Sequence, residues 1–500
     1  MRRVRFLAMP TYRSACCLTV AILFTTACSD SSGPKPGGPR IRLISGYNVT
    51  DTALALLKAA LVVEVRDSSG AVAPQGTLVR FTTVMKYGAI PEMLLQHPQY
   101  PSEFSILLEA ETDATGRARM FVRLGSLAGP ARLVVAAPTV AVEDTARYTV
   151  LPGNAQRVEL SPRDTTLYTG RSFTLRGTVV DAAGNPRTGT VTYTGSVPGV
   201  SVGSTGVVSV SAIGRYTVTG TGGGVSGSAG ISVVPQGTMA ASTVPGVAQQ
   251  IVVVALDGSG IRYLTSGATG STSSQPRWIP GTDRIIYSTF TSDRQLLRIV
   301  DQSGTVTPFL ASPPATMLDQ ADPSPSLNAP VVYFSAVDTR CSTTLYCLHR
   351  SGTDGSAPEP LGALFAPNET TWHPSSSPDG SRVAFVTGGS IIKVFDYASK
   401  TVLPWSVPGQ YPSWSPDGSR IAFVPQDGGP LHLINAADGS GERVLTPASR
   451  PYDVLPISWS SDSKWLLARA NAGVLDLIEV ATGTVLPLAY SSEFLSASLK

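Results

Sequence analysis

Residues 411–424 read YPSWSPDGSRIAFV, and looser forms of this stretch recur through the second half of the chain. Related stretches begin at residues 275, 322, 373 and 456, and each is followed by a further apolar run and a turn. Successive copies start roughly 40–50 residues apart. Repeats of that length with several strands each are typical of a β-propeller, in which one repeat forms one blade.

The centre of the repeat, SPDG at 415–418, has the composition of a tight turn. Serine and aspartate side chains accept backbone hydrogen bonds, proline presets φ, and glycine takes the positive φ that follows. The runs on either side, YPSW and RIAFV, therefore read as the two innermost strands of a blade. Trp278, Trp414 and Trp459 occupy the same place in their repeats, and we expect them to pack between blades.

These repeats resemble those of TolB-like propellers over residues 236–500. The region 237–267 looks like a blade that lacks its first strand, and 491–500 looks like a first strand that lacks its blade. Joined, the two make a sixth blade. The resemblance therefore implies a six-bladed propeller closed by the C-terminal strand, which hides two strand edges that would otherwise pair with other chains.

The region before the repeats is also predicted to be β-structure. Alternating runs such as LVVEVRD (61–67) and RYTVTGT (215–221) are separated by Gly, Asp, Asn and Pro, and helical periodicity is almost absent. Residues 41–152 and 153–235 resemble bacterial Ig-like domains of the invasin and intimin type, the second shorter than the first. The stretch 85–104 is interpreted as an inserted loop. The predicted fold class is all-β: two Ig-like β-sandwiches followed by the propeller.

The N-terminus has the pattern of an export signal. An Arg-rich start precedes the apolar run ACCLTVAILF at 15–24, which is too short to span a membrane. The sequence FTTAC resembles a bacterial lipoprotein signal, so 1–27 would be removed and Cys28 would carry lipid, although Thr25 stands where Leu is usual. Residues 28–40 are a polar Gly/Pro-rich tether. The alternative is ordinary secretion with cleavage near Ala27. The resemblance implies a cell-envelope lipoprotein, and Ser29 after the cysteine favours the outer membrane.

Charge and cysteine content agree with that compartment. Of the 38 basic residues, the four before Cys28 leave with the signal, so the mature chain is nearly neutral and offers no electrostatic case for nucleic acid. Cys16 and Cys17 also leave. Cys341 and Cys347 then remain in the segment CSTTLYC, and outside the cytoplasm such a pair predicts a disulfide. Two reduced thiols would require a cytoplasmic protein.

The sequence contains no nucleophile elbow, P-loop, HExxH or EF-hand motif. The Asp residues in turns such as SPDG are interpreted as turn residues. Gln275, Asp322, His373 and Tyr411 each precede the first strand of a repeat, so we expect them to form a polar ring at one mouth of the central channel. This ring is either a binding site for a peptide, a partner loop or an ion, or a hydrated rim without a ligand. Four histidines are too few for a channel metal site, and no metal or cofactor is predicted.

The order of these parts favours a non-enzymatic protein: an anchor, a tether, stiff modules and a terminal propeller that binds a protein or glycan. One alternative is a hydrolase or lyase that works in the propeller channel. Another is adhesion through the Ig-like domains, with the propeller as a cap.

Overall fold

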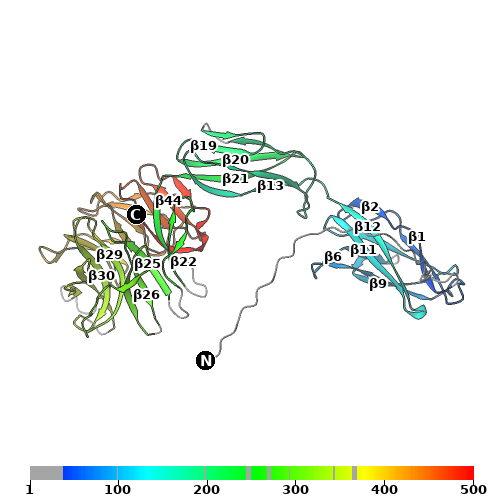
Figure 1. Cartoon of the computed structure of the whole chain (residues 1–500), viewed down its shortest axis with the longest axis horizontal. Coiled ribbons are helices and arrows are strands. Elements are labelled where there is room, and N and C mark those ends of the chain that lie inside the picture. The colour runs from blue at the N-terminus through cyan, green and yellow to red at the C-terminus, as the bar shows by residue number, and fades with distance from the viewer. Residues whose placement is uncertain are drawn as a thin grey trace, which may run out of the picture. The chain divides into compact units, whose positions relative to one another are not determined.

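The computed structural model describes residues 38–500 except 98–99, 196–198, 244–248, 267–271, 292, 342–343 and 363–368. The predicted signal, Cys28 and most of the tether lie outside the described residues. The chain divides into two compact units, Met1–Leu151 and Pro152–Lys500. The described structure is nearly all-β (Figure 1), with short 3-10 turns such as η1 (Pro138–Val140) and η3 (Ser491–Glu493). None of its helical segments is long and apolar enough to cross a lipid bilayer.

The first unit is a sandwich of two five-stranded sheets, ordered β1-β3-β10-β7-β8 and β2-β12-β11-β4-β9, with a small hairpin of β5 and β6. Side chains alternate along its strands: in β10 every second residue is buried, as period-two strands require. Inward-facing residues of both sheets, such as Val63 and Leu133, form one core. Its strands are β1 (Arg40–Ser45), β2 (Val49–Thr52), β3 (Leu61–Arg66), β4 (Leu78–Thr83), β5 (Met85–Lys86), β6 (Ile90–Pro91), β7 (Met93–His97), β8 (Tyr100–Ser105), β9 (Leu107–Glu111), β10 (Arg117–Leu124), β11 (Gly129–Ala137) and β12 (Val142–Leu151).

The interpretation of 85–104 as an inserted loop is wrong. This stretch supplies β7, which pairs with β10, and β8, which pairs with β7. Met93 and Leu95 are fully buried in the core of the sandwich. The prolines and glycine around the segment suggested a loop, but burial of its alternate apolar residues outweighs that local signal.

The second unit begins with a smaller sandwich. Its sheets are ordered β13-β16, β14-β21-β20-β17 and β15-β19-β18, and they share a core that includes Leu175, Val208 and Ile231. Figure 1 labels several of its strands. The strands are β13 (Arg157–Ser161), β14 (Asp164–Tyr168), β15 (Ser172–Thr174), β16 (Arg176–Val180), β17 (Thr192–Gly195), β18 (Val200–Val202), β19 (Val207–Val210), β20 (Gly214–Gly222) and β21 (Val225–Val234).

The rest of the second unit is propeller-like. Among the described residues, six antiparallel sheets of at least four strands each make up this region. In five of them, the strands lie side by side in sequence order, and in the sixth the last strand of the chain lies beside strands from the start of the region. The first five sheets are β25 (Thr272–Trp278), β26 (Ile285–Phe290), β27 (Gln295–Val300), β28 (Val306–Pro308); β29 (Met317–Pro325), β30 (Val331–Asp338), β31 (Tyr346–Gly352), β32 (Glu359–Pro360); β33 (Thr371–Ser376), β34 (Arg382–Thr387), β35 (Ile391–Asp396), β36 (Thr401–Val402), with β37 (Val407–Pro408) beside β35; β38 (Gln410–Trp414), β39 (Arg420–Val424), β40 (His432–Asn435), β41 (Arg443–Val444); and β42 (Ser458–Trp459), β43 (Trp465–Arg469), β44 (Leu475–Glu479), β45 (Val485–Pro487).

The sixth sheet joins the two ends of this region. Its order is β24 (Arg262–Tyr263), β23 (Ile251–Ala255), β22 (Thr238–Thr243) and β46 (Phe494–Leu499). The C-terminal strand β46 runs antiparallel to β22, with Met239 opposite Leu499 and Ala241 opposite Ala497. The strand pairing that the sequence predicts for the C-terminus is therefore present.

The repeated turn and the tryptophans have the local roles expected of them. In the turn at 415–418, Ser415 donates to Asp417 (2.6 Å), and Gly418 has φ +77°. The indole of Trp459 donates to the carbonyl of Ser413 in the neighbouring sheet (2.8 Å), and that of Trp278 donates to Ser498 (3.1 Å). These bonds tie adjacent sheets together at their inner strands.

Candidate functional site

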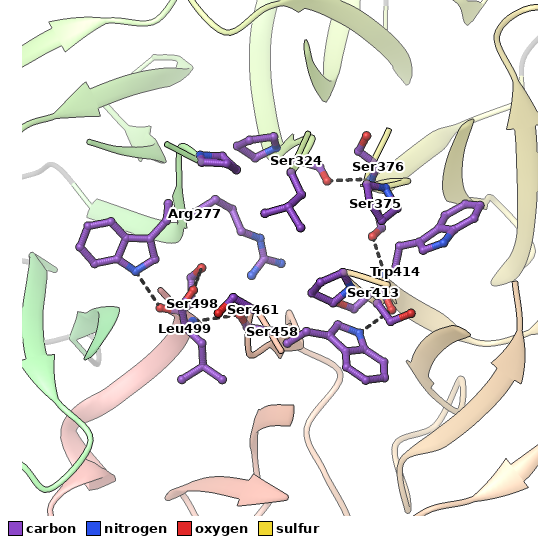
Figure 2. A pocket seen from close by; sticks show the side chains of 18 of the residues that line it. Arg277, Ser324, Ser375, Ser376, Ser413, Trp414, Ser458, Ser461, Ser498 and Leu499 are labelled. Carbon is purple, nitrogen blue, oxygen red and sulfur yellow. Dashed lines mark hydrogen bonds between the residues drawn. The ribbon is translucent and has the colours of Figure 1, made fainter. Parts of the chain in front are cut away.

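The inner strands of the six described sheets surround a cavity of about 340 Å³ on the side of the SPDG turns. Each strand contributes the residue at one equivalent position of the repeat, and these residues are Arg277, Ser324, Ser375, Ser413, Ser458 and Ser498. Figure 2 shows them around the hollow. Prolines and the three inter-sheet tryptophans complete much of the wall. The cavity thus combines hydroxyl groups with flat apolar surfaces, which is typical of ligand sites.

Three of the five serines bind the neighbouring sheet in the same way. In each case, the hydroxyl oxygen accepts the backbone N–H of the residue after the equivalent serine in the next sheet. The bonds are Ser376 N–H to Ser324 (2.9 Å), Trp414 N–H to Ser375 (2.8 Å) and Leu499 N–H to Ser458 (2.9 Å). The serines therefore fix the spacing of the inner strands around the cavity.

Arg277 occupies the sixth equivalent position. Its guanidinium group extends into the middle of the cavity (Figure 2). Within the part of the chain that the structure describes, it makes no hydrogen bond or ion pair. Burial lowers the pKa of Arg277 to about 10, while the charges of Asp322 and Tyr411 act to raise it. The group therefore remains a cation at neutral pH.

The four residues predicted to ring the channel mouth lie together. Gln275, Asp322, His373 and Tyr411 line a second, small cavity of about 20 Å³, and Arg277 lines both cavities. The amide of Gln275 donates to one carboxylate oxygen of Asp322 (2.5 Å), and the backbone N–H of His373 donates to the other (3.3 Å). The small cavity has room for about one water molecule.

All four of these residues have a left-handed backbone, with φ between 47° and 52°. Each precedes a proline and lies at a bulge where the register of its inner strand shifts. L-residues other than Gly, Asn and Asp rarely take this conformation, and a following proline restricts them further. A bulge re-aims a side chain. The repeated bulge therefore turns one side chain from each of four sheets toward the channel.

His373 is held between two aromatic rings. Its imidazole stacks on Tyr411, with centroids 3.7 Å apart, and on Trp372, with centroids 5.4 Å apart. Its Nε2 lies 4.0 Å from Asp322. Burial lowers the pKa of His373, against the opposing effect of the Asp322 charge. Burial likewise raises the pKa of the Tyr411 hydroxyl. Both side chains are therefore neutral at pH 7.

Cys341 and Cys347 lie side by side and are joined as a disulfide, with Cα atoms 6.7 Å apart. The ring of His349 lies next to them, and the possible ligand atoms of the three residues lie within 4.8 Å of one another. His349 is fully buried, with Nδ1 3.0 Å from the carbonyl of Cys347 and Nε2 3.1 Å from Asp338. A metal would need free thiolates, so a disulfide and a metal site are alternatives at this place.

Sequence reasoning missed Arg277 and the neighbourhood of the cysteines. A signal for Arg277 was present, because QPRW at 275–278 has Arg where YPSW at 411–414 has Ser. His349 carried no comparable signal. His349 lies beside the disulfide because it is on the same strand as Cys347, β31, two residues further along and opposite Phe334 of β30.

No family model matches the sequence, and no curated protein sequence matches it. Among solved structures, a protein of Agrobacterium tumefaciens assigned as TolB is 14% identical with a TM-score of 0.37, over 51% of this chain and 89% of that protein. A Bacteroides thetaiotaomicron protein of unknown function is 12% identical (TM-score 0.34; 69% and 88% covered). The oligogalacturonate lyase of Vibrio parahaemolyticus is 11% identical (TM-score 0.33; 60% and 86% covered). Likenesses this weak carry no functional conclusion for this chain.

Proposed function

We propose that this chain is a non-enzymatic binding protein of the cell envelope. Lipid on Cys28, which follows the export signal, anchors it in the outer membrane. Residues 41–152 and 153–235 are Ig-like spacers, and 236–500 form a six-bladed TolB-like propeller. The propeller binds a protein or glycan in its central cavity.

The wall of the cavity is the observation that carries this proposal. Six inner strands converge on a space of about 340 Å³, within the size range of ligand pockets. Serine hydroxyls supply hydrogen bonds, while Pro374, Pro412 and Leu327 supply apolar contact. Peptides and sugars both present this mixture of polar groups and apolar faces.

The alternative of a channel hydrolase or lyase has one observation in its favour. Nε2 of His373 lies 4.0 Å from a carboxylate oxygen of Asp322 in the channel, and histidine is the residue that acts most often as a general base. However, the imidazole lies between Trp372 and Tyr411, and the cavity beside it has room for about one water molecule. A substrate would not reach the ring, so binding is the better supported function.

A mouth-blocking variant tests the proposal. Ser461 is an exposed residue that lines the cavity, and Ser461→Trp would fill the entrance without disturbing the core. Val444, on the outer strand β41, is 57% exposed, so Val444→Trp is the matched control. We expect the immobilised mature chain to capture an envelope component from extract, Ser461→Trp to lose it, and Val444→Trp to retain it. Capture that survives Ser461→Trp would favour adhesion through the Ig-like domains instead.

A further inference from the structure

Five of the six equivalent cavity-lining positions on the inner strands hold serine, and the sixth holds Arg277. Ser324, Ser375, Ser413, Ser458 and Ser498 line the cavity from five sheets, and Arg277 lines it from the sixth. A serine at 277 would lack the bond that three of its five counterparts accept. The residue after Ser324 in the next sheet is Pro325, which has no N–H to donate. The scaffold therefore does not require serine at this position.

Arg277 has no structural partner that would explain it. The described residues offer its guanidinium no hydrogen bond or ion pair, although five N–H groups are available to donate. Burying an unpaired cation is unfavourable, and such groups are normally paired. Asp322, whose charge acts on Arg277, already accepts hydrogen bonds from Gln275 and from the backbone of His373. Arg277 is thus a cation directed into an empty part of the cavity.

The second charged side chain on the cavity wall is also positive. Among the described residues that line the large cavity, Arg277 and Lys500 have charged side chains, and no Asp or Glu side chain is among them. Lys500 pairs with Asp283 and lies 4.8 Å from the ring centre of Trp278, so its charge is partly neutralised at the entrance. The guanidinium group of Arg277 is the positive charge inside the large cavity, with serine hydroxyls around it (Figure 2).

We propose that the cavity recognises a carboxylate, which Arg277 binds through its guanidinium fork while the prolines and Leu327 contact the apolar remainder of the ligand. The inference rests on the proposed binding function and names its ligand class. A planar carboxylate matches the guanidinium geometry and can accept two parallel hydrogen bonds from it. A phosphate dianion would leave excess negative charge in a partly buried space. The carboxylate comes either from a small organic acid or from the C-terminus of a protein.

Matched probes test this on the full mature chain. N-acetylphenylalanine carries the carboxylate, and its amide is the neutral control. Binding is followed by calorimetry and by the indole resonance of Trp278. We expect the acid to bind roughly 10–100-fold more tightly than the amide, as loss of a charge-assisted hydrogen bond predicts. An acetylated hexapeptide ending in phenylalanine separates the sources: tighter binding than the single residue indicates a chain terminus, and equal or weaker binding indicates a small acid.

Two substitutions assign the preference to Arg277. Arg277→Ser, the residue of the other five positions, should abolish the difference between acid and amide. Arg277→Lys keeps the positive charge and should retain part of the preference for the acid. Lys500→Ser should leave that preference unchanged. Melting curves establish that each variant is folded. Equal binding of acid and amide, absence of acid binding, full retention in Arg277→Ser, or tighter binding of inorganic phosphate would each overturn the proposal. Capture of an envelope component that remains sensitive to Ser461→Trp would then still uphold the binding function.

Discussion

The imidazole ring of His373 lies nearly parallel to the phenol ring of Tyr411, with centroids 3.7 Å apart and planes 17° apart. The two residues come from the inner strands of neighbouring sheets, and both have a left-handed backbone. The stack therefore links the bulges of two adjacent sheets. Because it encloses the imidazole, it also opposes protonation of the ring.

Stability should fall in mild acid partly because of His373. Burial lowers its pKa in the folded chain below the ordinary value of 6.5. As pH falls below that value, the unfolded chain takes up the proton first, so the folded state loses stability until its own lower pKa is reached. The charge of Asp322 and a hydrogen bond with Gln410 act in the opposite direction, to raise the pKa of His373. We expect His373→Gln to reduce the loss of unfolding free energy between about pH 7.5 and pH 5.

Denaturant melts at the two pH values measure this effect. His349 is also buried with a lowered pKa, so it contributes equally to both proteins and the difference between them reports His373. An unchanged pH dependence in His373→Gln would show that its pKa is not lowered in the folded chain.

A buried ion pair in the last full sheet should be important for stability. Asp476 is fully buried and accepts hydrogen bonds from Arg450 (2.5 and 2.6 Å) and from the hydroxyl of Tyr452 (2.9 Å). Arg450→Met would leave the carboxylate buried without its cation, which should lower the free energy of unfolding by about 3–5 kcal/mol. The exposed pair Lys464–Asp462 provides the control. Lys464→Met should change the free energy of unfolding by less than about 1 kcal/mol. Equal effects in chemical denaturation would contradict the assignment.

The sequence predicted the relationships that depend on the repeat. A shared position in several copies placed Gln275, Asp322, His373 and Tyr411 together, because equivalent residues of a ring of sheets point to one channel. The left-handed backbone of those residues was not predictable, since each precedes a proline, which disfavours compact conformations. Tertiary packing of the bulge overrides that preference.

The errors and omissions concern contacts that only the fold creates. Segment 85–104 has the prolines of a loop, but Met93 and Leu95 complete a core whose other members lie elsewhere in the sequence. Arg277 was visible as a departure from the repeat. Its lack of a partner could be known only after Pro325 and Asp322 had been placed beside it.

The cysteine pair should be oxidised in the mature protein. Intact mass should rise by two hydrogens on reduction, and replacing both Cys341 and Cys347 with Ser should lower the free energy of unfolding by about 2 kcal/mol, as expected for a short closed loop. Free thiols in freshly purified protein would contradict this. If that reduced protein also binds one equivalent of zinc, and His349→Ala abolishes the binding, the two cysteines and His349 form a metal site instead of a disulfide.

The anchor prediction concerns Cys28, outside the described residues. Lipid on this cysteine should hold the protein in the membrane fraction, and Cys28→Ala should release it to the soluble fraction. Ser29→Ala is the matched control, because it leaves the cysteine intact. An unchanged membrane fraction for Cys28→Ala would refute the lipoprotein assignment and leave ordinary secretion as the alternative.

Removal of residues 491–500 should unfold the propeller selectively. The deletion removes β46, which pairs with β22 along five residues and receives the indole bond of Trp278. It also removes the buried side chains of Phe494 and Leu499, whereas Leu495 is only half-buried. At about 1 kcal/mol for each hydrogen bond and about 1.5–3 kcal/mol for each large buried side chain, the loss approaches the whole stability of a domain.

Calorimetry of the full chain and the truncated chain distinguishes a closing strand from a free tail. The first sandwich has its own core, so its transition should persist, while the propeller transition moves to lower temperature or gives way to aggregation through the exposed edge of β22. A point variant gives the same information with less disruption. Ala497 is 2% exposed, so Ala497→Asp should reproduce the effect, because it places a carboxylate between packed sheets. Glu493→Ala, at an exposed position, should not. A truncated chain that melts like the full chain would mean that β46 does not close the ring.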